Sequence, residues 1–173
     1  MHIPDGFIDI PTSAAFGTLA LAGTAIALKK AKTEVDDRTA PMAGLTAVFI
    51  FAVQMLNFPV AAGTSGHLLG AALAAVLIGP YAATLAITIV LILQALLFAD
   101  GGLSALGLSI FNMSLLAVWF GYGVFLLVKK VMPKKKISIS IAAAIAALLS
   151  VPAAAAGFVL QYAIGANATF SVS

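Results

Sequence analysis

Two histidines are the only imidazole side chains in this 173-residue chain, and both stand where they could bind a metal. His2 directly follows the initiator methionine, and His67 follows the polar stretch Gly63-Thr64-Ser65-Gly66. Because the initiator methionine is generally removed only before small residues, we expect Met1 to stay and to present a free α-amine. That amine, the His2 amide nitrogen and His2 Nδ1 can close two fused chelate rings on one ion. Three nitrogens in nearly one plane favour Ni(II), Cu(II) or low-spin Co(II).

A fourth ligand must come from elsewhere in the chain, and His67 is the one remaining histidine. We expect Thr64 or Ser65 to lie at the pocket and to cap a helix that begins close to His67. Apolar surroundings and a helix N-terminus both lower the pKa of a histidine, which keeps the imidazole neutral and able to bind a metal. The sequence therefore predicts a metal site made by Met1, His2 and His67.

A turn near the chain start would bring the end of the chain back onto the protein. Ile3-Pro4-Asp5-Gly6 predicts a type I turn with Pro4 at its second position. We expect Asp5, within this turn, to lie close to the metal site. A fixed N-terminal segment is what such a site needs, because a disordered terminus cannot hold an ion in one geometry.

Each histidine also has an ordinary interpretation. His2 can be a residue at a frayed chain end, and His67 a hydrogen-bonded polar group near a membrane interface. Ionisable groups at membrane depth, however, are usually functional. The chain contains no cysteine, so thiolate metal sites, disulfides and cysteine nucleophiles are excluded.

The composition indicates that the solvent of this protein is a lipid bilayer. Hydrophobic residues make up 62% of the chain, charged residues only 9%, and the mean hydropathy is +1.14. A soluble domain carries about 25% charged residues. We therefore expect one transmembrane domain over residues 1–173. The net charge of +3 comes from two basic blocks between apolar runs, which is typical of membrane loops and does not indicate nucleic-acid binding.

Six apolar runs predict helices, because backbone groups in lipid must form their hydrogen bonds internally. The third run is too short to cross a bilayer alone at about 1.5 Å per residue. We expect an all-α bundle of about six transmembrane helices, with a short third helix and the N-terminus folded into the bundle. The runs are 11–28, 41–57, 67–79, 81–98, 103–128 and 137–164.

The basic blocks predict the orientation of the bundle. They lie at residues 29–38 and 129–136, after the first and the fifth run, so four crossings place them on one side. The positive-inside rule makes that side cytoplasmic, which leaves the N-terminus, the 58–66 loop and Asp100 outside. No basic residue precedes Lys29, so we expect no cleavable signal peptide. The prediction is a multi-pass protein of a prokaryotic cell membrane with its N-terminus outside.

Two segments of the chain resemble the signature segments of the CbiM/NikM family. They are Met1-His2-Ile3-Pro4-Asp5-Gly6-Phe7 and Gly63-Thr64-Ser65-Gly66-His67. This family comprises the substrate-binding subunits of energy-coupling-factor (ECF) transporters for cobalt and nickel. Residues 94–102 and 107–112 are also similar to the family, and the resemblance runs through most of the chain.

The resemblance implies a planar site and a set of partners. The Met1 amine, the His2 amide and imidazole, and the His67 imidazole would surround the metal. Gln94 and Asn112 would lie in the pocket or hold its ligands, although hydrogen bonding between helices explains them equally well. The implied partners are a transmembrane coupling protein, ATPase subunits and often a small accessory membrane protein. Family members usually continue into a further apolar helix beyond the point where this chain ends.

The chain itself is predicted not to be an enzyme. It contains no G-x-x-x-x-G-K-[ST] loop, so ATP hydrolysis must take place in another chain. A self-sufficient secondary transporter or channel for divalent metal ions would need charged residues inside the helices, and an intramembrane enzyme would need a carboxylate pair, a Ser/Lys dyad or an HExxH motif. The favoured interpretation is a metal-capturing subunit of an ATP-driven importer, with Ni²⁺ or Co²⁺ bound as substrate and no cofactor. The ligand set leans to nickel, raw affinity would place copper above both metals, and nickel and cobalt stay open.

Overall fold

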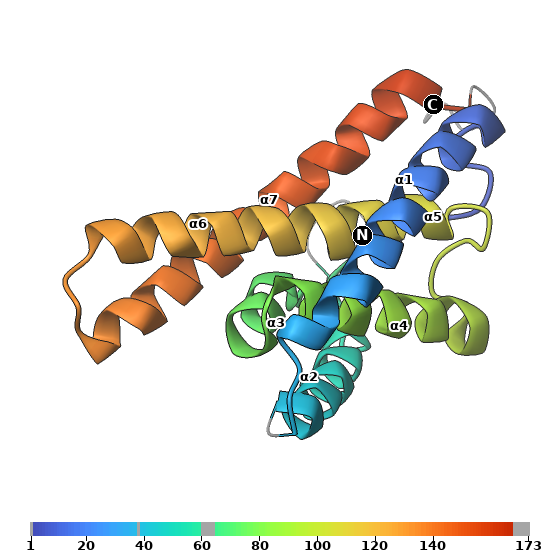
Figure 1. The fold of residues 1–173 in the computed structure, drawn as a ribbon. Helices are drawn as coiled ribbons and strands as arrows, with labels where there is room; N and C mark the ends of the chain where they lie inside the picture. The colour runs from blue at the N-terminus through green and yellow to red at the C-terminus, as the bar shows by residue number, and fades with distance from the viewer. Residues whose placement is uncertain (1, 38, 60–64, 168–173) are drawn as a thin grey trace.

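The computed structural model describes residues 2–37, 39–59 and 65–167, and their regular secondary structure is helical apart from one two-residue strand pair and an isolated bridge between Ile8 and Ala166 (Figure 1). In the described residues, α5, η2 and α6 run on as one helix, so the chain forms six helical rods, and the predicted all-α bundle is confirmed. The helices are α1 (Ile10–Lys30), η1 (Ala31–Thr33), α2 (Thr39–Gln54), α3 (Ala71–Ile78), α4 (Pro80–Phe98), α5 (Leu106–Ser109), η2 (Ile110–Leu116), α6 (Ala117–Val131) and α7 (Lys136–Gly165). The strands are β1 (Phe58–Pro59) and β2 (Ser65–Gly66), which pair antiparallel.

Four helical segments are long and apolar enough to cross a membrane: Ile10–Thr33, Pro80–Phe98, Leu106–Val131 and Lys136–Gly165. Large apolar side chains on the outside of the bundle are exposed, among them Val131 at 86% and Ile10 at 83%. Exposed apolar surface of this kind is stable against lipid and unstable against water. The protein is therefore a multi-pass membrane protein.

Helix α3 is short and lies within the bundle. It packs against α2, α4, α6 and α7, and its alanines, Ala71, Ala72, Ala74 and Ala75, are buried. Small side chains allow this close approach of helix backbones in a membrane. The predicted short third helix is confirmed.

The start of α3 differs from the prediction. The helix begins at Ala71, after Gly70 with φ 76°, and no side chain caps it. The prediction that Ser65 caps this helix is therefore wrong, because Ser65 lies in β2, five residues before the N-cap Gly70. Thr64, the other predicted cap, lies outside the described residues. Gly70 causes the shift, since its left-handed backbone favours glycine and a Cβ there would lie 2.9 Å from the Ile50 side chain. His67 consequently lies in the irregular segment between β2 and α3.

The start of α4 is held by a side chain from another part of the chain. Pro80 occupies the first turn of α4, and the Ala82 amide donates to Glu34 Oε2 at 2.8 Å. A carboxylate at a helix N-terminus accepts an otherwise unpaired amide and complements the helix dipole. Glu34 thus ties the α1–α2 connection to α4, the helix whose other end leads to Asp100.

The N-terminal segment, residues 2–9, is folded into the bundle as predicted. Ile3 is 2% exposed and packs with Ile8, Ala105 and Leu108. The Gly102 amide donates to the Ile3 carbonyl at 2.8 Å, which ties the segment to the α4–α5 loop.

The far end of the N-terminal segment is tied to α7 and contains a turn. The Asp9 amide donates to the Gly165 carbonyl at 2.8 Å. The turn spans Pro4–Phe7, one residue later than predicted, because Gly6 adopts φ 76° and so takes the third position of a type II turn.

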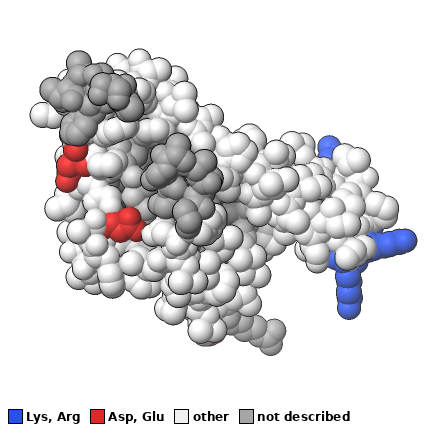
Figure 2. All heavy atoms as spheres, turned by 180° about the vertical axis from the view of Figure 1, so that it is seen from behind, with Lys and Arg blue, Asp and Glu red and all other residues white. Residues whose placement is uncertain are grey.

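Charged side chains are unevenly distributed on one face of the molecule. On the face shown in Figure 2, acidic side chains gather at one end and basic side chains at the other. This division matches the charge pattern from which the orientation was predicted.

Candidate metal site

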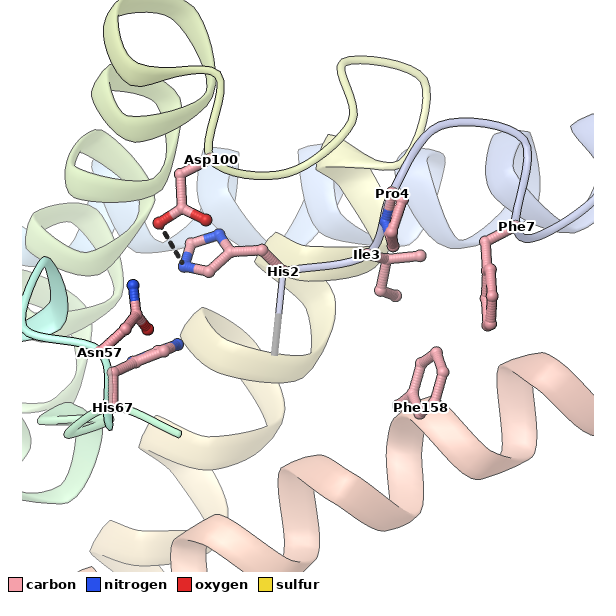
Figure 3. Close-up of a pocket in the computed structure, with 8 residues that line it drawn as sticks. All are labelled: His2, Ile3, Pro4, Phe7, Asn57, His67, Asp100 and Phe158. Carbon is pink, nitrogen blue, oxygen red and sulfur yellow. Dashed lines mark ion pairs between the residues drawn. The ribbon is translucent and has the colours of Figure 1, made fainter. Parts of the chain in front are cut away.

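His2 and His67 come together in one pocket, although they lie far apart in the sequence (Figure 3). Their ring centroids are 5.2 Å apart and the ring planes are inclined by 41°. The pocket has a volume of about 370 Å³. Its lining residues in the described chain are His2, Ile3, Pro4, Phe7, Asn57, His67, Asp100 and Phe158.

His2 is held neutral by its surroundings. Its side chain is 9% exposed, and its Nε2 lies 3.6 Å from Asp100 Oδ2. Burial lowers the pKa of His2 to about 4, and the Asp100 carboxylate opposes part of that shift. At neutral pH the imidazole is therefore uncharged and can act as a ligand.

His67 is oriented by the backbone of the next residue. Its Nδ1 lies 3.0 Å from the Leu68 carbonyl oxygen, which only accepts, so Nδ1 carries the hydrogen and donates. The lone pair available to a metal is then on Nε2. Burial lowers the pKa of His67 as well, so this imidazole is also neutral at pH 7.

The loop that follows α4 has two glycines, Gly101 and Gly102, where it contacts the N-terminal segment. Gly101 has φ 95°, and a Cβ at this position would lie 3.1 Å from His2 Cβ and 3.4 Å from His2 Nδ1. At Gly102 a Cβ would collide with the Asp5 backbone nitrogen. Both glycines are thus needed for the close approach of the two segments.

Asp5 anchors this contact from the other side. Its Oδ1 accepts from the Ser104 amide at 2.8 Å and from the Ser104 hydroxyl at 2.6 Å. These hydrogen bonds lower the pKa of Asp5, so the carboxylate stays charged. The structure places Asp5 at the base of the N-terminal segment and not in the lining of the pocket.

The remaining predicted site residues are not among the described lining residues of the pocket. Met1 and Thr64 fall outside the described residues, and Ser65 lies in β2. Gln94 is fully buried in α4, with Nε2 4.0 Å from Met55 Sδ, and is not among the lining residues. Asn112 exchanges two hydrogen bonds with Gln161 of α7, at 2.7 and 3.0 Å, which is the hydrogen bonding between helices that the sequence left open.

Two polar lining residues, Asn57 and Asp100, were not predicted as site residues from the sequence. Asn57 lies beside His67, and Asp100 faces His2 (Figure 3). The glycine pair directly after Asp100 was the signal for the second of them, because adjacent glycines at a helix end indicate close backbone contact. In the described part of the chain, no three or more His, Cys, Asp or Glu residues form a group able to hold a metal ion.

Known proteins are similar to this chain in sequence, and a solved structure is similar to it in fold. A putative metal transport protein of Methanocaldococcus jannaschii is 38% identical over 161 residues, which covers 91% of this chain and 70% of the relative. A putative metal transport protein of Haloquadratum walsbyi is 41% identical over 76% of this chain. A putative fused nickel transport protein NikMN of Archaeoglobus fulgidus is 42% identical over 72% of it.

A solved structure described as a truncated transition metal transporter has a TM-score of 0.84 and 34% identity, covering 93% of this chain and 73% of that one. The chain spans 60% of the length of the Haloquadratum relative and 41% of the Archaeoglobus relative. The family model described as the cobalt uptake substrate-specific transmembrane region, CbiM, matches residues 2–173. The chain belongs to the CbiM family.

Proposed function

We propose that this protein is the metal-capturing membrane subunit of an ATP-driven importer for Ni²⁺ or Co²⁺. The observation that carries the proposal is the pair of neutral imidazoles, His2 and His67, facing each other at 5.2 Å in one pocket. Metal–imidazole bonds are about 2.0–2.1 Å long, so one ion between the rings can bind a nitrogen of each. Relatives named as nickel and cobalt transport proteins support the choice of these metals.

The proposed ligands are four nitrogens in one plane. Met1 precedes His2 directly, so its amine, the His2 amide and His2 Nδ1 form a tridentate chelate, and His67 Nε2 completes the plane. The hydrogen bond of His67 Nδ1 to Leu68 supports this assignment, because it leaves the lone pair on Nε2. A planar nitrogen set suits Ni(II) and low-spin Co(II).

The N-terminal segment acts in this proposal as both ligand and lid. It closes the pocket with Ile3, Pro4 and Phe7, and it supplies three of the four nitrogens. Release of the metal then requires the segment to leave its place against the α4–α5 loop. In this proposal the partner subunits displace the segment, and ATP hydrolysis supplies the free energy for that step.

The uncharged interior of the described bundle supports a subunit driven by partner ATPases over a self-sufficient secondary transporter. The buried polar side chains of the described helices are Thr, Ser, Gln and Asn, and none of them is charged. Proton- or ion-coupled carriers use ionisable groups within the membrane. The proposed partners are a transmembrane coupling protein, ATPase subunits and a small accessory membrane protein, in a prokaryotic cell membrane with the pocket facing outward.

A removable N-terminal extension tests the metal site. One residue added before Met1 should abolish high-affinity Ni²⁺ and Co²⁺ binding, since it converts the terminal amine into an amide. Calorimetry on the purified protein measures the affinity before and after a protease cleaves the extension and regenerates Met1. Binding should return after cleavage.

The cleaved sample is its own control for folding. Wild-type affinity in the extended protein, with an unchanged melting temperature, would show that the terminal amine is not a ligand.

Uptake by the lone chain separates the proposal from the secondary transporter. In membranes without partner ATPases, the protein should bind metal and give no concentrative uptake, because it has no nucleotide-binding loop. Accumulation measured with radioactive Ni²⁺ that collapses with the proton gradient would favour the secondary transporter instead.

A further inference from the structure

Asp100 lies in the pocket but supplies none of the four proposed nitrogen ligands. It is the only acidic side chain among the described lining residues. Its Oδ2 lies 3.6 Å from His2 Nε2, the ring nitrogen that the proposed chelate does not use. His2 Nε2 is buried and has no hydrogen-bond partner within the described residues. A buried donor of this kind is costly unless an acceptor can reach it.

The two ring nitrogens of His2 therefore have different roles: Nδ1 binds the metal and Nε2 carries the hydrogen. Chelation with the His2 amide closes a ring only through Nδ1, so the hydrogen of the neutral imidazole must be on Nε2. A carboxylate only accepts, and Asp100 is placed to favour the tautomer with Nε2–H. The hydrogen bond of the second ring nitrogen commonly sets which nitrogen binds a metal.

The charge of the complex gives Asp100 a second task. When a divalent ion binds the His2 amide nitrogen, the N–H bond breaks and its proton leaves to solvent. The ion and the amide anion together then carry one net positive charge, while the amine and both imidazoles are neutral. Removing such a charge from water is costly unless an opposite charge lies nearby.

We infer that Asp100 is the positioning residue of the metal site: from its place 3.6 Å away it accepts a hydrogen bond from His2 Nε2–H when the metal is bound, and it supplies the counter-charge for the bound ion. The inference rests on the proposed function. The adjacent Gly101 supports it, since its lack of a side chain leaves the Nδ1 edge of the ring accessible while Asp100 holds the Nε2 edge. Asp100 does not itself bind the metal.

Two substitutions separate the two tasks. Asp100→Asn keeps an oxygen acceptor and removes the charge, and Asp100→Ala removes both. Loss of a partner that orients a metal ligand typically lowers affinity by about 10–100-fold. Calorimetry with Ni²⁺ on the full chain should give affinities that decrease from wild type through Asp100→Asn to Asp100→Ala. The affinity of the Ala variant should be about 10–100-fold below that of wild type.

A second readout excludes a merely structural role. In protein saturated with Ni²⁺, the visible ligand-field band should shift between wild type and Asp100→Ala, because the imidazole loses its hydrogen bond to the carboxylate. A residue that only supports the fold would leave the band of the saturated protein unchanged. The wild-type complex should be diamagnetic, as planar Ni(II) is. A paramagnetic wild-type complex that becomes diamagnetic in Asp100→Ala would identify Asp100 as a direct ligand and overturn the inference.

Asp9→Asn is the matched control. It removes one negative charge from the N-terminal segment outside the pocket, and asparagine still caps α1 in place of Asp9. Its Ni²⁺ affinity should equal that of wild type. Wild-type affinity in either Asp100 variant would overturn the inference while leaving the proposed function intact, whereas absence of Ni²⁺ and Co²⁺ binding in wild type would contradict the proposed function itself.

Discussion

Each histidine of the pocket has one ring nitrogen directed at an oxygen that can only accept a hydrogen bond. For His2 this is Nε2, which faces the Asp100 carboxylate, and for His67 it is Nδ1, which faces the Leu68 carbonyl. The lone pairs then reside on His2 Nδ1 and His67 Nε2. This is the pair of tautomers that the proposed planar chelate requires, and it is present in the structure without a metal.

His67→Ala tests the ligand role at the scale of one side chain. The metal affinity should fall by more than the roughly 10–100-fold that loss of an orienting partner costs, since a ligand is removed. Without metal, stability should change by no more than about 0.5 kcal/mol, because the hydrogen bond that is lost, from His67 Nδ1 to the Leu68 carbonyl, is exposed. Calorimetry and thermal unfolding on the same preparation give both quantities.

Asn57→Ala is the control for His67→Ala. It removes another polar side chain from the same pocket without removing a proposed ligand, so its affinity should fall far less. A histidine that served only as a hydrogen-bonded structural group would show the opposite pattern, with about 1–3 kcal/mol lost from the metal-free protein and wild-type affinity. That result would exclude His67 as a ligand.

Among the elements, the N-terminal segment and the α4–α5 loop form the contact on which the site depends. The segment contributes the Ile3 carbonyl and the Asp5 carboxylate, and the loop contributes the Gly102 and Ser104 amides. The loop can approach this closely because it has glycines where a side chain would collide.

Gly102→Ala should displace the N-terminal segment. The added Cβ would collide with the Asp5 backbone nitrogen, which cannot move without losing the hydrogen bonds that hold the segment. Metal affinity should fall sharply, and amide hydrogen exchange over residues 2–8 should accelerate. Exchange in α4 and α6 should stay as in wild type.

Gly123→Ala in α6 is the matched control for this change. The same methyl group meets nothing within 4 Å there. Its metal affinity should be unchanged, and the helix should gain about 0.5–1 kcal/mol from the replacement of a helical glycine. Normal metal affinity in Gly102→Ala would show that the observed docking of the segment is not required for the site.

At the scale of the whole molecule, the distribution of charge predicts which compartment the pocket faces. Acidic and basic side chains lie at opposite ends of the face shown in Figure 2, and the pocket contains the acidic residue Asp100. The positive-inside rule then predicts an outward-facing pocket and a cytoplasmic α6–α7 connection. An outward pocket is what an importer requires for capture.

Single cysteines test this orientation directly, since the chain has none of its own. Leu103→Cys, at a position 58% exposed in the α4–α5 loop, should react with a membrane-impermeant maleimide on intact cells. Lys134→Cys, between α6 and α7, should react only after the membrane is permeabilised. The cysteine-free parent shows the background, and the reverse pattern of labelling would contradict an outward-facing pocket.

The sequence alone determined the membrane character, the helical rods and the two histidines. Hydropathy and helix length depend on residues close together in the chain, so composition and periodicity reveal them. The position of His2 beside a terminal amine is also a local property. These features were readable before any packing was known.

Only the tertiary structure decided which polar groups surround the histidines. Asp100 and Asn57 reach the pocket because α2, α4 and the N-terminal segment converge there, and no local pattern encodes that convergence. Packing likewise moved the start of α3 to Ala71, where Gly70 passes close to Ile50. Asn112 looked equally suited to the pocket and to a partner helix, and its choice of Gln161 depended on how α7 packs against η2. Contacts between distant segments are set by the shape of the whole bundle, and the sequence around each residue does not contain that information.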